Sequence, residues 1–148
     1  RLYPTVVIPD TELHKMFLQG RYCPMQQEDA IIRTAAMYRI LDSAGINIIR
    51  VGLKSSDIIN GKNMQAGTFH PAFRQLVEGK IAQEDLDIQL RGCKPNTSVC
   101  CVSHPDSFNN MIGHKAVNKK YFSSAYPDLR ISYKADGNMR KGTYSIKF

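Results

Sequence analysis

The chain has 148 residues, 43 % of them hydrophobic, which is enough for one ordinary domain or two small ones with an apolar core. There is no long apolar run and no signal-like start, so composition excludes a membrane-spanning protein and predicts a cytoplasmic one without membrane contact. Four cysteines without a repeating framework suit a reducing cytosol better than a disulfide scaffold.

The formal net charge of +7 lies entirely in the last part of the chain. Residues 1–90 hold ten Lys and Arg against ten Asp and Glu, whereas residues 91–148 hold ten against three. Such asymmetry predicts two functional parts and an anionic partner for the second part.

The first part begins with an apolar run, residues 2–8, that predicts a strand. Asp10 is the expected N-cap of a short helix that ends at Gly20. A longer helix follows, with apolar residues at spacings of three and four, and stops at Gly45. The residues expected on its inner face are Ala30, Ile31, Thr34, Met37, Tyr38, Leu41 and Ala44.

A second apolar run, residues 46–53, is rich in β-branched side chains and predicts a parallel strand buried on both faces. Strand, helices and strand in this order form a right-handed crossover unit. Residues 54–68 then form a loop at the C-terminal end of that strand, where parallel α/β proteins carry active sites. A helix begins near Pro71, beside which His70 is expected to cap or pack, with a catalytic role as the alternative.

The last part has the alternating and helical patterns of a small α+β domain. Residues 97–102 predict a strand, a short helix stops at Gly113, and a second helix runs from Val117 to Ala125. Alternation predicts further strands over 129–135 and 143–148. Strand, helix, Gly-led loop, helix and strand is the order of a KH RNA-binding module, whose GXXG loop clamps a nucleic-acid backbone.

The loop itself departs from the KH pattern at one position. Ala116 stands where a GXXG loop has its second glycine, so close approach of a nucleic-acid backbone is less easy. The residues expected to bind RNA or phosphate are Gly113, His114, Lys115, Asn118, Lys119 and Lys120. The alternative is a solvated basic face in which Gly113 merely joins two helices.

Several motifs of the first part occur in the order found in a known family. They are Arg1-Leu2-Tyr3-Pro4-Thr5, Thr11-Glu12-Leu13, Gly20-Arg21-Tyr22-Cys23-Pro24, Gly45-Ile46-Asn47-Ile48-Ile49-Arg50-Val51-Gly52-Leu53 and Ala66-Gly67-Thr68-Phe69-His70-Pro71-Ala72-Phe73-Arg74. Together they resemble the second half of the radical SAM barrel in the shorter bacterial relatives of the Elongator catalytic subunit. The later Ile112-Gly113-His114-Lys115-Ala116-Val117-Asn118 resembles a Gly-His-Lys-x-x-Asn element in the C-terminal extension of those proteins.

The resemblance implies an α/β fold in which residues 1–92 form the C-terminal part of a radical SAM, partial TIM-type barrel. Residues 93–148 would form the basic α+β domain with KH-like order. The parent enzyme would cleave S-adenosylmethionine with an iron–sulfur cluster and act on RNA, as in tRNA modification.

This sequence lacks the Cys-x-x-x-Cys-x-x-Cys motif that holds the cluster. It also starts at Arg1, directly before a strand. We therefore expect a fragment that binds no metal or cofactor alone, is not catalytic alone, and partners the missing N-terminal half of the barrel. Half a barrel leaves a sheet edge uncovered, which predicts association into homo-oligomers.

Within such a barrel, Tyr3 and Thr5 lie on one strand, Arg50 lies on the next and His70 follows. These four residues are expected to face the substrate or cofactor at the barrel mouth. In the alternative, Tyr3 and Thr5 fill the barrel interior and Arg50 pairs with an acidic neighbour. No residue is assigned a catalytic role.

Two other functions remain open on the sequence alone. The chain is either an RNA- or phosphate-binding module in its own right, or a small cysteine-dependent enzyme that pairs Cys101 with His104 or His114. A zinc site of Cys93, Cys100, Cys101 and His104 is disfavoured, because neighbouring strand residues point to opposite faces. We expect the cysteines to act as small buried hydrophobes.

Overall fold

The computed structural model describes residues 1–54 and 64–148, which form two units. Unit 1 is Arg1–Val77 and unit 2 is Glu78–Phe148, so the division falls within helix α3 (Phe73–Leu90). The sequence places the domain boundary later, at residue 92, after that helix ends. Among the described residues, no helix combines the length and the apolar character that crossing a membrane requires.

Unit 1 contains helices α1 (Glu12–Leu18) and α2 (Gln27–Ser43), strands β1 (Val6–Val7) and β2 (Ala66–Gly67), and the start of α3. The glycines expected after α1 and α2 have left-handed φ values of 71° at Gly20 and 70° at Gly45, which confirms both as helix stops.

The N-cap of α1 differs from the prediction. Thr11 caps this helix, and its Oγ1 accepts a hydrogen bond of 3.2 Å from the backbone N–H of His14. Asp10 was therefore the wrong residue. It adopts a left-handed φ of 62° in the turn before the helix, which an Asp tolerates better than most residues.

The two predicted strands of unit 1 are mostly unformed. Leu2 and Val51 make an isolated parallel bridge, in which Leu2 N–H donates to the Arg50 carbonyl at 2.9 Å and Gly52 N–H donates to the Leu2 carbonyl at 2.8 Å. The bridge has the direction that a crossover unit requires. β1 instead pairs antiparallel with β2, which lies in the stretch predicted as a loop. Residues 55–63 of that loop lie outside the described residues.

The second apolar run is buried on one side only. Ile48 and Val51 are buried, but Ile46 and Ile49 are 53 % and 62 % exposed, so the predicted burial on both faces is wrong. On the buried side, Phe73 of α3 packs directly on Gly52, where a Cβ atom would come within 2.8 Å of the Phe73 Cβ. Among the described residues, this run is therefore packed against α3 on one side and is largely exposed on the other.

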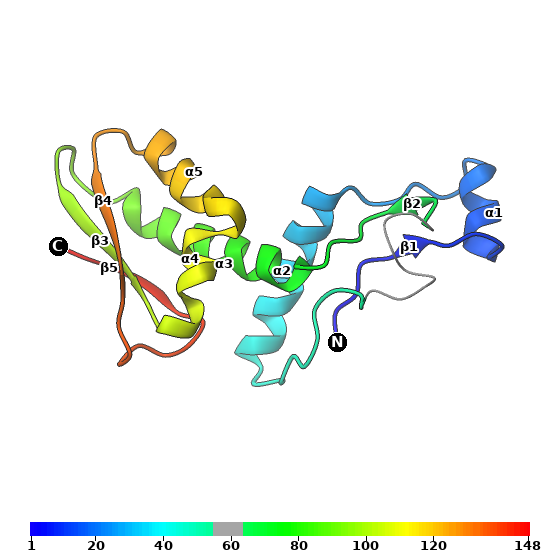
Figure 1. Cartoon of the computed structure of the whole chain (residues 1–148), viewed down its shortest axis with the longest axis horizontal. Helices are drawn as coiled ribbons and strands as arrows, with labels where there is room; N and C mark the ends of the chain where they lie inside the picture. The colour runs from blue at the N-terminus through cyan, green and yellow to red at the C-terminus, as the bar shows by residue number, and fades with distance from the viewer. Residues whose placement is uncertain (55–63) are drawn as a thin grey trace. The chain divides into compact units, whose positions relative to one another are not determined.

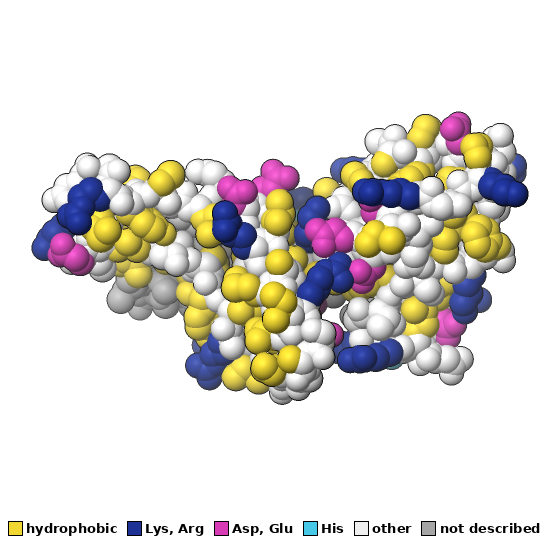
Figure 2. All heavy atoms as spheres, turned by 180° about the vertical axis from the view of Figure 1, so that it is seen from behind, with side chains coloured by type: hydrophobic (Ala, Val, Ile, Leu, Met, Phe, Trp, Pro, Cys, Tyr) yellow, Lys and Arg dark blue, Asp and Glu magenta, His cyan; other side chains and the backbone are white. Residues whose placement is uncertain are grey.

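α2 likewise buries a narrow stripe. Ala30 and Thr34 are buried, as their spacing predicts, and Ala35 is buried although it was not expected on the inner face. Met37 was expected inside and is 45 % exposed. Ile40 is 66 % exposed. Figure 2 shows hydrophobic side chains gathered over this part of unit 1. Unit 1 therefore presents apolar surface on both its helix and its second apolar run.

Unit 2 is built on a three-stranded sheet in the order β4-β3-β5, with β3 parallel to β4 and antiparallel to β5 (Figure 1). Its elements after α3 are β3 (Ser98–Ser103), α4 (Phe108–Ile112), α5 (Val117–Ala125), β4 (Arg130–Ala135) and β5 (Tyr144–Lys147). Each of these elements agrees with its sequence prediction, and α5 has the predicted bounds. Short 3₁₀ turns at Pro105–Ser107 and His114–Ala116 precede α4 and α5.

The core of unit 2 lies between the sheet and its helices. The buried apolar side chains are Ile81, Ala82, Leu86, Leu90, Val99, Cys101, Val102, Met111, Phe122 and Tyr144. They come from α3, α4, α5 and the sheet, so all three helices contribute to one core.

Candidate nucleic-acid interface

The loop between α4 and α5 is fixed by a glycine that no other residue can replace without a clash. Gly113 ends α4 with φ at 81°. A Cβ atom there would lie 2.9 Å from the Asn118 Cγ, the Asn118 backbone N and the Val117 Cγ1. Both the left-handed φ and the lack of space require glycine at this position.

Two further residues of the loop also have left-handed backbone angles. Lys115 has φ at 52° and ψ at 33°, and Ala116, the N-cap of α5, has φ at 59° and ψ at 30°. Left-handed backbone costs a residue with a Cβ about 1–2 kcal/mol. Ala116 thus occupies the position of the second glycine of a GXXG loop in a conformation that glycine adopts more cheaply.

Asn118 holds this loop from the inside. It is 2 % exposed, and its Nδ2 donates to the carbonyls of Gly79 at 2.8 Å, Asn110 at 3.2 Å and Met111 at 3.3 Å. The sequence grouped Asn118 with the RNA-binding residues. The structure instead places its amide in the interior, where it links the loop to α3.

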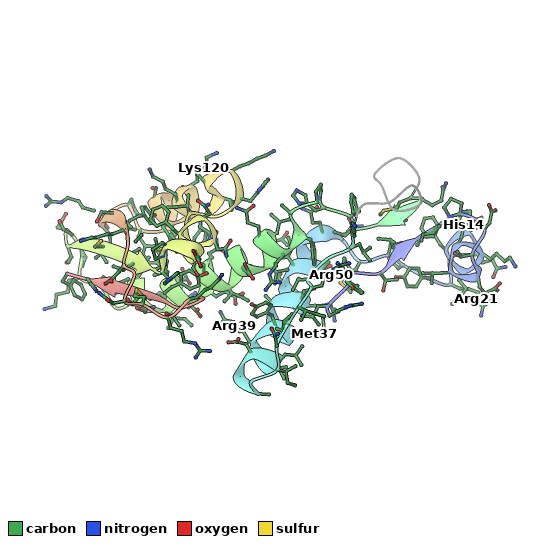
Figure 3. The ribbon with its side chains drawn as sticks, turned by 60° about the horizontal axis from the view of Figure 1, so that its bottom comes forward. His14, Arg21, Met37, Arg39, Arg50 and Lys120 are labelled. Atoms are coloured by element: carbon green, nitrogen blue, oxygen red, sulfur yellow. The ribbon has the colours of Figure 1, made fainter. Side chains whose placement is uncertain are left out.

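The three lysines around the loop point the other way. Lys115, Lys119 and Lys120 are exposed, and no ion pair or side-chain hydrogen bond involves them in the described part of the chain. Lys120 projects outward from α5 (Figure 3). His114 is half-buried beside them. The loop therefore presents unpaired positive charge at the start of a nine-residue helix, where backbone N–H groups also favour anions.

Elsewhere in unit 2, some basic side chains form ion pairs and others do not. Lys80, Arg91, Lys141 and Lys147 are neutralised by Glu84, Asp87, Asp106 and Asp136. Besides the three loop lysines, the basic side chains without an ion pair among the described residues of this unit are Lys94, Arg130, Lys134 and Arg140. The unpaired charge is what an anionic partner would meet.

Unit 2 contains a buried carboxylate cluster that was not predicted from the sequence. Asp87 of α3 is 8 % exposed and accepts hydrogen bonds from the Tyr121 hydroxyl at 2.9 Å, the Tyr126 hydroxyl at 2.7 Å and the Arg91 guanidinium. Burial acts to raise the pKa of Asp87, but the hydrogen bonds from Tyr126, Tyr121 and Arg91 outweigh it and hold that pKa below its ordinary value. Only the four-residue spacing of Asp87 and Arg91 signalled part of this cluster.

The same cluster perturbs its tyrosines. Burial and the hydrogen bond to Asp87 raise the pKa of Tyr126 to about 12. Both hydroxyls therefore stay protonated and donate to the carboxylate at any ordinary pH. The arrangement ties α3 to α5 and to the segment after it.

The residues predicted at the barrel mouth are at the surface of unit 1. Tyr3 is 45 % exposed, and Thr5 and Arg50 are exposed. In the described residues no ion pair involves Arg50, which lies in the segment beside α2 (Figure 3).

His70 lies at the start of α3, where it has the expected capping role. Its Nδ1 accepts a hydrogen bond of 3.1 Å from the backbone N–H of Ala72. Nearby, a pocket of about 280 Å³ is lined by Met64, Gln65, Ala66, Gly67 and Phe69, in the stretch that the sequence assigned to an active-site loop.

The cysteines argue against a cysteine-dependent enzyme. Cys101 is fully buried, and burial, with Cys100 and Cys93 nearby, raises the pKa of its thiol to about 12. A thiol with so high a pKa is a poor nucleophile at neutral pH. Cys100 is half-buried on the opposite face of β3, as strand alternation predicts. Among residues 1–54 and 64–148, no three His, Cys, Asp or Glu side chains are grouped to hold a metal ion.

Comparison with known proteins gives one match. Neither the curated proteins nor the solved structures contain a significant match to the chain. A family model described as the Radical_SAM C-terminal domain matches residues 1–83, which is more than half of the chain and includes all of unit 1. The chain therefore belongs to the Radical_SAM C-terminal domain family.

Proposed function

We propose that this chain works as the C-terminal part of a radical SAM enzyme related to the Elongator catalytic subunit, with RNA as its substrate class. Membership of the Radical_SAM C-terminal domain family supports the first half of this proposal. The observation that carries it furthest is the uncovered apolar surface of unit 1, which a complete barrel would bury.

That surface is costly for a unit that functions alone. A parallel strand with its crossover helix is normally covered on both faces. Here Ile46 and Ile49 of the second apolar run and Met37 and Ile40 of α2 remain exposed. Complete burial of a fully exposed side chain of this size contributes about 1.5–3 kcal/mol, so covering one of these partly exposed side chains contributes about half of that. We assign the covering role to the N-terminal half of the barrel, which would bring its own strands against the Leu2–Val51 bridge.

The residues of this chain do not fit the iron–sulfur cluster that the family implies. A cluster needs several cysteine thiolates close together. Among residues 1–54 and 64–148 no three metal-ligating side chains are grouped, and Cys101 is buried in the apolar core of unit 2. In this proposal the cluster and S-adenosylmethionine are held by the other half of the enzyme, and this chain supplies barrel wall and substrate binding.

RNA binding is assigned to unit 2. Its order of β3, α4, loop, α5 and β4 resembles the order expected of a KH module, which supports the assignment. The loop carries Lys115, and Lys119 and Lys120 lie on the following helix. Unpaired lysines beside a helix N-terminus suit the phosphates of a single strand. Gly113 and Asn118 would shape the loop, and His114 would lie within it.

A filter-binding experiment tests the RNA assignment. Affinity of the chain for a single-stranded RNA 12-mer should fall with salt, with a slope of about −0.7 per phosphate contacted. The double variant K119A/K120A should weaken binding to every RNA sequence and reduce that slope by about 1–2. The matched control K94A/R140A removes the same charge from exposed, unpaired positions outside the loop.

Equal losses in the two double variants would mean diffuse attraction and contradict a site at the loop.

A second candidate function, an RNA- or phosphate-binding module that needs no barrel, is favoured by the same lysines. That alternative expects unit 1 to stay monomeric in solution despite its exposed isoleucines, which light scattering measures directly.

A further inference from the structure

The sheet of unit 2 has two edges, and the fold closes one of them. β5 is the outer strand on one side, in the order β4-β3-β5. Gln89 of α3 reaches its free edge, where Nε2 donates to the Tyr144 carbonyl at 3.1 Å and Oε1 accepts from the Ile146 N–H at 3.1 Å. The same Nε2 also donates to the Asp85 carbonyl at 2.9 Å, which anchors the side chain on its helix. One carboxamide thus takes the place of a neighbouring strand.

The opposite edge, on β4, has no such closure. The N–H of Arg130 donates to the Thr97 carbonyl and the N–H of Asp136 to the Ser103 carbonyl, so even-numbered residues face β3. Backbone groups alternate along a strand, which turns those of Ile131, Tyr133 and Ala135 outward. In the described residues, no hydrogen bond outside the β3–β4 ladder involves these three.

The basic and the apolar side chains of β4 lie on opposite faces of the sheet. Arg130 and Lys134 pair with Ser98 and Val102 of β3, so they lie on the same sheet face, and both are exposed without an ion pair in the described residues. On the other face, Ile131 and Tyr133 are half-buried. The edge therefore has a basic side and an apolar side, and neither Pro nor Gly interrupts it.

These charges decide which partner fits. A second copy that paired β4 with β4 about a two-fold axis perpendicular to the sheet would gather Arg130 and Lys134 of both copies on one sheet face, where like charges repel. An anionic strand would be attracted instead. A polypeptide also repeats its N–H and C=O groups at the spacing of β4, which a sugar–phosphate chain does not.

We propose that the open edge of β4 binds an extended acidic peptide segment, which joins the sheet as a fourth strand beside Ile131, Tyr133 and Ala135. Acidic side chains of the segment lie against Arg130 and Lys134, and its apolar side chains cover Ile131 and Tyr133. The backbone supplies the pairing and the alternating side chains supply the selectivity.

A designed probe tests this edge on the whole chain. The peptide acetyl-(Glu-Val)₄-amide presents Glu on one face and Val on the other in either strand direction. Titration followed by amide NMR should shift the Ile131, Tyr133 and Ala135 N–H signals and slow their hydrogen exchange. The variant R130E/K134E should weaken binding about tenfold, whereas the charge-matched K94E/R140E, at exposed positions outside this edge, should bind as the unmodified chain does.

Two further probes separate strand pairing from simple charge attraction. Methylating every peptide nitrogen keeps the charges of the probe but removes all of its N–H donors, so it should abolish binding in either strand direction. Ala135→Pro removes a single outward N–H at an exposed position and should also weaken binding. Unchanged binding of the fully methylated peptide would overturn the proposal. So would unprotected edge amides at millimolar peptide, or protection of those amides by an RNA 12-mer alone.

Discussion

The side-chain amide of Asn118 lies 2.8 Å from the backbone carbonyl of Gly79, to which it donates a hydrogen bond. Asn118 is the second residue of α5, and Gly79 lies in α3, thirty-nine positions earlier. The buried amide therefore connects two helices. Its other two hydrogen bonds go to the carbonyls of Asn110 and Met111 in the last turn of α4. Because a buried amide without partners costs about 1–3 kcal/mol, this side chain can adopt few alternatives.

Gly113→Ala should destabilise unit 2 by at least about 2 kcal/mol, because the new Cβ meets Asn118 and Val117 at 2.9 Å and φ is 81°. Urea unfolding followed by circular dichroism measures the loss. Gly137→Ala is the control, since nothing lies within 4 Å of a Cβ at that glycine and its φ is not left-handed. Equal midpoints for the two variants would contradict the described loop.

Ala116→Gly should stabilise the chain by about 0.5–1 kcal/mol, even though glycine is usually destabilising. Relief of the left-handed φ of 59° exceeds the entropy that glycine adds to the unfolded chain. The same substitution at Ala125, the last residue of α5, should not stabilise. A lower unfolding midpoint for Ala116→Gly would show that residue 116 is not left-handed.

Asp87 should make stability depend on pH in the acid range. Its pKa is lower in the folded state than in the unfolded state, where the ordinary value is 3.8. The stabilisation is therefore fully present above the unfolded pKa and is lost as the pH falls through the folded value. Thermal unfolding from pH 7 to pH 2 measures this loss.

Asp87→Asn should lower stability at pH 7 and flatten that acid dependence, because the variant has no proton to bind at this site. Asp128→Asn, at an exposed position, serves as the control and should keep the dependence of the unmodified chain. An unchanged acid slope in Asp87→Asn would contradict the charge state assigned to the cluster.

The chain should self-associate through unit 1, because Ile46 and Ile49 are 53 % and 62 % exposed. Exposed apolar side chains that lie close together favour association. Light scattering at high micromolar concentration should show dimers or larger species. The variant I46K/I49K should shift the population to monomer. The control I88K/F148K changes two apolar residues of unit 2 that are even more exposed, at 70 % and 85 %, and should leave association intact.

A strictly monomeric unmodified chain would remove the need for a covering partner and weaken the barrel proposal. The same result would favour the binding-module alternative, because unit 1 would then tolerate its exposed surface in water.

Local signals in the sequence determined most elements of unit 2 and the helices of unit 1. α5 runs from Val117 to Ala125 as predicted, and Gly20 and Gly45 end their helices, because capping and helical periodicity act over a few neighbouring residues. Alternation likewise located β4 and β5. The concentration of positive charge after residue 90 was also readable from the sequence.

Tertiary structure alone decided the rest, because those features join residues far apart in the chain. Strands in unit 1 form only where a partner supplies hydrogen bonds, so the apolar run 46–53 reduces to one bridge at Val51. The Asp87 cluster unites α3 with Tyr121 and Tyr126, more than thirty positions away. Asn118 has the same polar side chain whether it meets RNA or three carbonyls, and only the packing of α3 against the loop turned it inward.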